Sequence, residues 1–177
     1  MADLYPDASE DIPINAPEPR GNSAQINVFV DADHAGDKST RRSQTGIIIL
    51  INQTPVIWFS KKQNTVETST FGAEFIALRI ATEKIIALRY KLRMFGVPID
   101  GPAQVFCDNE SVVKNTSNPE SSLNKKHLAC AYHKVRESVA AKIMIIFFER
   151  GETNLADLLT KALPPVKRKQ IMRGLFG

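Results

Sequence analysis

The sequence has few of the residues that bind zinc, cross-link a chain or span a membrane. Its two cysteines, Cys107 and Cys130, are at a spacing typical of no metal site. His127 and His133 have no third nitrogen or sulfur ligand at a suitable spacing, so no zinc site is predicted. No run is apolar enough to cross a bilayer, and the N-terminal residues lack the basic-then-apolar plan of a secretory signal. These absences favour a reduced, intracellular chain with no membrane partner.

The composition is that of a globular domain with a basic balance. The chain has 177 residues, of which 43% are hydrophobic and 24% charged, which is enough for one domain with a sizeable core. Its formal net charge is +4. A positive balance mildly favours a polyanionic partner, although many proteins without one share it.

Three segments are expected along the chain. Residues 1–24 combine four prolines and five acidic residues with few apolar ones, which predicts a disordered or extended linker, although a plain flexible terminus is equally compatible. Residues 25–163 carry the alternation of strand and helix patterns expected of a folded domain. Residues 164–177 form a basic amphipathic tail, a pattern more often found in a solvated helix face than in a binding element.

The pattern of the domain predicts an α/β fold. Apolar, β-branched runs predict strands over 25–32, 46–51 and 56–60 joined by short turns, which is typical of an antiparallel meander. A long helix over 71–95 follows, with Thr70 as its N-cap and Gly96 as its stop. Further strands are expected over 103–107 and 142–148, and further helices after Asn109, over 126–141, and from Asn154 to the Pro164-Pro165 pair.

Four acidic residues lie at the ends of these elements. Asp31 and Asp108 each end an apolar strand run, and Glu74 begins the apolar stripe of the long helix. Asp157 lies in the first turn of the last predicted helix. Three of the four have a structural alternative: Glu74 as a charge placed for the helix dipole, Asp108 as a cap, and Asp157 as the acid of a reciprocal cap.

Taken together, the four acids predict a metal site. Acids at the ends of neighbouring strands converge at one edge of a sheet, where open α/β sheets bind ligands. A carboxylate cluster stays ionised at neutral pH only beside bound cations. Magnesium prefers such oxygen ligands, and two ions about 4 Å apart stabilise both the attacking and the leaving oxygen in phosphodiester hydrolysis.

Several short motifs occur in a fixed order along the chain. They lie at residues 31–37, 41–46, 58–63, 73–78, 107–111, 126–127 with 132–133, and 156–161. With these motifs, the sequence from about Asn27 to Leu163 resembles the ribonuclease H domain of copia-type LTR retrotransposon polyproteins. The acidic, proline-bearing N-terminal segment is similar to the linker that follows the reverse transcriptase in such polyproteins.

The resemblance implies a ribonuclease H-like fold, with a mixed five-stranded sheet whose first three strands are antiparallel. It implies an endoribonuclease that cleaves the RNA strand of RNA–DNA hybrids during reverse transcription, with two Mg²⁺ ions, for which Mn²⁺ can substitute. The catalytic acids of the family, which are also its metal ligands, correspond to Asp31, Glu74, Asp108 and Asp157. An upstream reverse transcriptase domain is the implied protein partner, and a cytoplasmic retrotransposon particle, or the nucleus, the implied location.

Five further residues are candidates for substrate binding. Strand alternation places Asp33 on the same face as Asp31, as an accessory acid. Asn109 and Ser111 are short polar groups that suit sugar or phosphate contacts, or that simply cap a helix. Arg42 and Lys61 suit phosphates of the DNA strand, although basic pairs are usually solvated.

Some positions depart from the family pattern and keep two other functions open. Gly72, Ala129 and Ala131 replace residues common in the family, and the loop before Asp157 carries no histidine. The first alternative is therefore a catalytically degenerate domain that binds or tethers nucleic acid. The second is a structural domain whose acids only cap helices.

Overall fold

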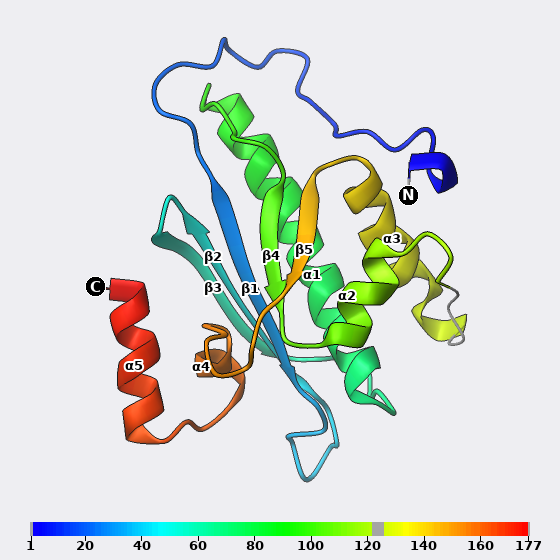
Figure 1. The fold of residues 1–177 in the computed structure, drawn as a ribbon, viewed down its shortest axis with the longest axis vertical. Helices are drawn as coiled ribbons and strands as arrows, with labels where there is room; N and C mark the ends of the chain where they lie inside the picture. Colours follow the sequence, from blue (N-terminus) through cyan, green and yellow to red (C-terminus); the bar gives the residue numbers. More distant parts are fainter. Residues whose placement is uncertain (1, 122–125, 177) are drawn as a thin grey trace.

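The computed structural model describes residues 2–121 and 126–176 and contains one five-stranded sheet with helices on both faces (Figure 1). Residues 122–124 of the predicted polar loop lie outside the described residues. The strands are β1 (Ile26–Asp33), β2 (Gln44–Ile51), β3 (Thr54–Lys62), β4 (Ala103–Cys107) and β5 (Met144–Phe148). The α-helices are α1 (Thr70–Met94), α2 (Glu110–Ser117), α3 (Ala129–Ala140), α4 (Asp157–Thr160) and α5 (Pro165–Phe176), with 3₁₀ turns at Ala2–Leu4 and Lys126–Leu128.

The order of the strands confirms the predicted mixed sheet. Across the sheet the order is β3-β2-β1-β4-β5. The first three strands pair antiparallel, whereas β4 lies parallel to β1 and β5 parallel to β4. Among the described residues, no helix combines the length and the apolar character needed to cross a bilayer.

Strand β2 contributes to two hydrophobic cores, because its side chains alternate between the two faces of the sheet. Ile47 and Ile49 belong to the main core, which α1 and α3 cover. Ile48 and Leu50 point to the opposite face and belong to a smaller cluster beneath α5. The basic tail is therefore a helix that buries one apolar face on the sheet.

The long helix α1 has the predicted length, but its N-cap is one residue earlier than expected. Ser69, not Thr70, is the cap, because Ser69 has the extended backbone that an N-cap needs and its side chain accepts a hydrogen bond from the Gly72 amide. Gly96 ends the helix as predicted, in the left-handed conformation (φ +68°) that glycine adopts without strain.

The last predicted helix is interrupted. Helix α4 ends at Thr160, because Lys161 takes an extended backbone conformation. The proline pair does not end this helix as expected. Pro165 instead occupies the first position of α5, where its missing N–H costs nothing. The helix predicted over 126–141 is also divided, into the 3₁₀ turn Lys126–Leu128 and α3.

The N-terminal segment, drawn in blue in Figure 1, leads from α3 past the C-terminal end of α1 to the start of β1. Glu10 forms ion pairs with Arg89 (2.7 Å) and Arg93 (2.6 Å) of α1. Tyr5 is hydrogen-bonded through its hydroxyl to Nδ1 of His133 on α3 (2.8 Å). The expectation that residues 1–24 are a disordered or extended linker stays a prediction, and Glu10 provides a test of it.

Replacement of Glu10 by Gln should destabilise the protein in a pH-dependent way. Burial raises the pKa of Glu10, but hydrogen bonds from Arg89 and Arg93 outweigh it and lower this pKa from 4.5 to about 2. Such a carboxylate stabilises the folded state above pH 4.5 and loses its contribution as the pH falls toward 2. We expect E10Q to lower the melting temperature at pH 7 by about 2–4 °C, and by less as the pH falls below 4.5.

The measurement is a series of thermal melts followed by circular dichroism, with Glu18→Gln as the control. Glu18 is an exposed acid of the same segment. Equal melting temperatures for E10Q, E18Q and the parent protein at pH 7 would show that the segment is not held on α1 in solution.

Candidate active site

Three aspartates from separate segments meet at one end of the sheet. Val30 of β1 pairs with Cys107 of β4 in parallel, so the residues that follow them, Asp31 and Asp108, lie at the same edge. Asp157 begins α4 beside them. Carboxylate oxygens of the three aspartates lie within 4.8 Å of one another. The structure thus brings together three of the four acids that the sequence singled out as metal ligands.

Glu74 lies against the same cluster, in the second turn of α1. Its side chain is 2% exposed, and Oε1 accepts a hydrogen bond from the Ala32 amide (3.2 Å). Oε2 is buried with no hydrogen-bond partner among the described residues. A carboxylate placed only for the helix dipole would have no reason to be buried in this way. One of its oxygens lies within 4.8 Å of ligand atoms of Cys107 and Asp108.

Close contact between β2 and α4 helps to form this site. Gly46 of β2 pairs with Asp31, and a Cβ atom added to it would lie 2.7 Å from Cγ2 of Thr160 and 2.8 Å from the Ala156 carbonyl oxygen. Only a glycine lets α4 approach this closely. The Asn154 side chain fixes the preceding loop, because it donates a hydrogen bond to the carbonyl oxygen of Val30 (2.9 Å).

Two lysines and a threonine that the sequence analysis did not single out contact the aspartates. Nζ of Lys161 lies 3.1 Å from Asp31 and 2.7 Å from Asp157. Nζ of Lys167, on α5, lies 2.7 Å from the other oxygen of Asp157 and 3.0 Å from the Gly151 carbonyl oxygen. Thr160 donates a hydrogen bond to Asp31. With its carboxylate held by lysines, Asp157 does not form the reciprocal cap that was the structural alternative.

Burial and mutual repulsion perturb the acids. Burial raises the pKa of Asp31, and burial together with the Asp31 charge raises that of Asp108. The same effects hold the pKa of Glu74 well above its usual value. Burial works against the charge of Lys161, but the hydrogen bond to Asp157 and the charge of Asp31 outweigh it and raise the Lys161 pKa. The cluster therefore has excess negative charge that favours nearby cations.

The donor set fits a divalent cation that prefers oxygen. Asp31, Asp108 and Asp157 offer carboxylate oxygens at short mutual distance, and Glu74 adds a buried oxygen without a partner. Burial keeps the pKa of the Cys107 thiol well above its usual value, so this sulfur remains protonated and is a poor ligand. An all-carboxylate set is the one expected for Mg²⁺ or Mn²⁺ rather than for zinc.

Two of the predicted substrate residues line the hollow at the acids. Asp33 and Asn109 border it together with Asp31, Glu74 and Asp108. Asn109 also caps α2, because its side chain accepts a hydrogen bond from the Val112 amide (3.2 Å). The cap alternative for Asn109 is thus present in the structure, and a substrate contact remains a prediction.

The other three predicted substrate residues lie further away. Arg42 lines an adjoining polar hollow with Lys62, Asp33 and Lys161. Lys61 lines a separate groove that also contains His127. Ser111 is an exposed residue of α2 and is not among the residues that border the hollow at the acids.

A buried acid explains the unexpected glycine before Glu74. A Cβ atom at Gly72 would lie 2.5 Å from Oε2 of Glu67. Glu67 is 5% exposed, and the same oxygen is 3.1 Å from Nε2 of His127. Gly72 therefore leaves room for a polar link between the loop before α1 and the turn before α3, and the sequence pattern gave no sign of this link.

The comparisons agree with the fold and with the sequence motifs. No family model matches the chain. It is 31% identical over 144 residues to the retrovirus-related Pol polyprotein from transposon RE1 of Arabidopsis thaliana, which covers 81% of this chain and 10% of that protein. The Pol polyprotein from transposon TNT 1-94 of Nicotiana tabacum is also 31% identical over 144 residues, with 81% and 11% covered. The chain thus spans about a tenth of the length of these relatives.

The fold is similar to that of a solved structure. The crystal structure of LC11-RNase H1 in complex with an RNA/DNA hybrid superposes with a TM-score of 0.60 at 19% identity, covering 77% of this chain and 94% of that one. The strand order and this likeness show a ribonuclease H-like fold. Its sequence relatives are Pol polyproteins of copia-type transposons, which confirms the resemblance to the ribonuclease H domain of a retrotransposon polyprotein.

Proposed function

We propose that the chain is a metal-dependent endoribonuclease that hydrolyses the RNA strand of an RNA–DNA hybrid. The observation that carries the proposal is the meeting of three aspartate carboxylates within 4.8 Å, from segments far apart in sequence. The buried, unpartnered oxygen of Glu74 beside them supports it. A structural neighbour that was crystallised with an RNA/DNA hybrid supports the substrate class.

In this proposal Asp31, Glu74, Asp108 and Asp157 hold two Mg²⁺ ions and are the catalytic residues. Bound divalent cations would supply a nucleophile at neutral pH and stabilise charge on the phosphate. The protein's own cations now neutralise part of the cluster: Lys161 pairs with two aspartates and Lys167 with one. Metal binding therefore competes with these ion pairs.

The polar hollow next to the acids suits the sugar–phosphate backbone. Arg42, Lys62 and Lys161 are the cations among the described residues that border it. Backbone contacts of this kind recognise the shape of an A-like duplex without reading its sequence. Lys61 and Ser111, which lie outside this hollow, would contact substrate only if the duplex extends beyond it. The natural setting would be an intracellular retrotransposon particle or the nucleus, with an upstream reverse transcriptase domain in the same polyprotein.

The second candidate is a domain that binds the hybrid without cleaving it. The contacts of Lys161 and Lys167 with the aspartates favour this alternative, because amines already occupy the carboxylates. A labelled RNA–DNA hybrid incubated with the protein and Mg²⁺ separates the two functions. Shorter RNA products support the first function, and salt-sensitive binding without products supports the second.

Divalent cations should raise the thermal stability of the protein. An ion at a concentration ten times its Kd, bound only to the folded state, adds about 1.4 kcal/mol, which raises the melting temperature of a domain of this size by about 3–5 °C. The measurement is a thermal melt of chelator-treated protein with 10 mM (about ten times an assumed Kd near 1 mM) MgCl₂ or MnCl₂. NaCl at equal ionic strength is the control, and an equal shift in NaCl would show that the acids bind no divalent ion.

A further inference from the structure

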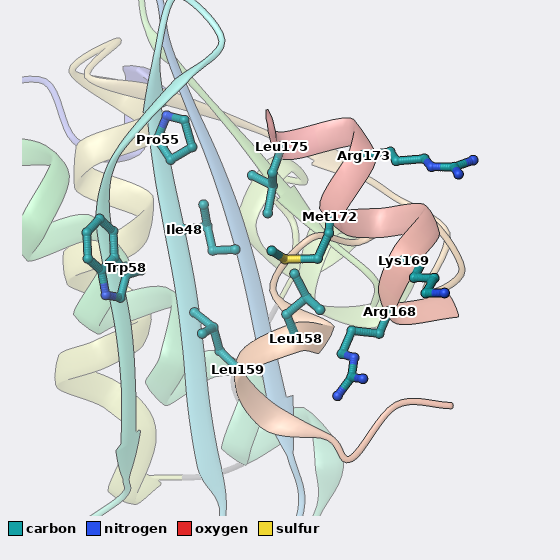
Figure 2. Close-up of a pocket in the computed structure, with 10 residues that line it drawn as sticks. All are labelled: Ile48, Pro55, Trp58, Leu158, Leu159, Arg168, Lys169, Met172, Arg173 and Leu175. Carbon is teal, nitrogen blue, oxygen red and sulfur yellow. The ribbon is translucent and has the colours of Figure 1, made fainter. Parts of the chain in front are cut away.

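An apolar groove lies between the edge of the sheet and the C-terminal helix, and none of the four acids lines it. It has a volume of about 850 Å³. Figure 2 shows side chains of β2 and β3 on one side of it and those of α4 and α5 on the other. The apolar residues that form its walls include Ile48, Trp58, Leu158, Leu159, Met172 and Leu175.

The walls of the groove expose large apolar side chains. Trp58 is 70% exposed and Met172 is 42% exposed. The neighbouring residue Phe59 points to the other face of the sheet and packs against the main core. Single exposed apolar residues are ordinary, but several that line one concave surface are typical of a binding site.

Three basic side chains that form no ion pair with a described residue line the groove. Arg168, Lys169 and Arg173 are among its lining residues, and Figure 2 shows their side chains extending from α5. None of the three forms an ion pair with another described residue, whereas Lys62 and Arg79 do. No carboxylate of the described residues lines the groove, and the sequence has no acidic side chain after Asp157. A ligand with negative charge would therefore meet cations that have no partner within the described chain.

The residue types favour a protein ligand over a nucleic acid. Tryptophan, methionine and arginine are enriched at protein–protein interfaces and in their energetic centres. Single-stranded nucleic acids instead stack their bases on successive aromatic side chains. Among the described residues, Trp58 is the one aromatic residue that lines the groove, and the rest of the apolar lining is aliphatic apart from Met172 and Pro55.

We propose that this groove binds an acidic, amphipathic protein segment. The segment places apolar side chains between Trp58 and α5, and its carboxylates pair with Arg168 and Arg173. This binding site is separate from the proposed catalytic residues and does not depend on cleavage activity.

Trp58 provides a direct test, because it is the only tryptophan in the chain. The probe is a synthetic helical peptide with Leu and Phe on one face and Glu on the other, added to the full chain. We expect saturable binding that shifts the tryptophan emission to shorter wavelength as Trp58 becomes buried. The double variant R168E/R173E should weaken binding at least tenfold, whereas Lys91→Glu, a single charge reversal at an exposed lysine on α1, should not.

Three results would overturn the proposal. These are no change in emission with the acidic peptide, equal binding of a peptide with Lys in place of Glu, or a stronger response to a single-stranded RNA oligonucleotide. The last result would assign the groove to nucleic acid. Unliganded variants must keep the circular dichroism and emission spectra of the parent protein, and Met172→Glu provides a second variant on the groove wall. Loss of cleavage by the acid variants would leave the emission titration unchanged, so the two proposals can fail separately.

Discussion

Asp108→Asn is expected to reduce Mg²⁺-dependent cleavage of an RNA–DNA hybrid by more than about a hundredfold, because it removes a negatively charged ligand from the proposed metal site. Asp108 is the most informative of the four acids to change. Its carboxylate forms no ion pair with other described residues, whereas those of Asp31 and Asp157 pair with lysines. The substitution also removes charge that raises the pKa of Glu74. The folded state should therefore keep its stability while activity is lost.

The measurement compares initial rates of hybrid cleavage for D108N and for Glu110→Gln. Glu110 is an exposed acid two residues away that pairs with Lys114 on the surface of α2. A surface pair of this kind is worth little, so E110Q should retain the rate of the parent protein. Undiminished cleavage by D108N would remove Asp108 from the proposed site. Equal loss in both variants would indicate a general effect on α2.

Arg136→Met is expected to lower the free energy of unfolding by about 3 kcal/mol, since each buried polar group left unpaired costs about 1–3 kcal/mol. Arg136 of α3 is 1% exposed. Its guanidinium donates hydrogen bonds to the carbonyl oxygens of Asn115 (3.1 Å), Ser121 (3.2 Å) and Pro119 (2.9 Å). Methionine fills similar space but cannot donate to these carbonyl groups.

The measurement is urea unfolding followed by far-ultraviolet circular dichroism, with Lys134→Met as the control. Lys134 is an exposed residue on the same helix, so K134M should stay within about 0.5 kcal/mol of the parent protein. A change for R136M no larger than that of K134M would mean that water replaces the guanidinium at no cost. The segment after α2 would then depend little on Arg136.

The sheet could be predicted from the sequence because its signals are local. Apolar runs marked all five strands, short polar turns joined the first three, and β4 was predicted with its observed bounds. The cap of α1 was misplaced by one residue because Ser69 and Thr70 are equally good capping types, and only the backbone conformation distinguishes them. The break after Thr160 was missed because the apolar pattern continues through it to Leu163.

The acids of the candidate site were predicted from the sequence, but the lysines that pair with them were not. Asp31 and Asp108 end apolar runs, and parallel pairing of β1 with β4 brings these two together. Glu74 begins an apolar stripe, and Asp157 lies in the first turn of a predicted helix. Lys161 had a signal in the sequence, since it lies four residues after Asp157 and so on the same face of the predicted helix. Lys167 had none, because its contact with Asp157 depends on how α5 folds back on the sheet after the proline pair.

Because Gly46 has no side chain, a mutation at this position would change the geometry of the proposed site. The distance between Asp31 and Asp157 depends on the position of α4, a four-residue helix that packs directly against the backbone of β2 at Gly46. A single methyl group at this position would push α4 away from β2, because it would clash with atoms of Thr160 and Ala156. The carboxylate geometry could thus be disrupted by mutation of a residue that has no functional group at all.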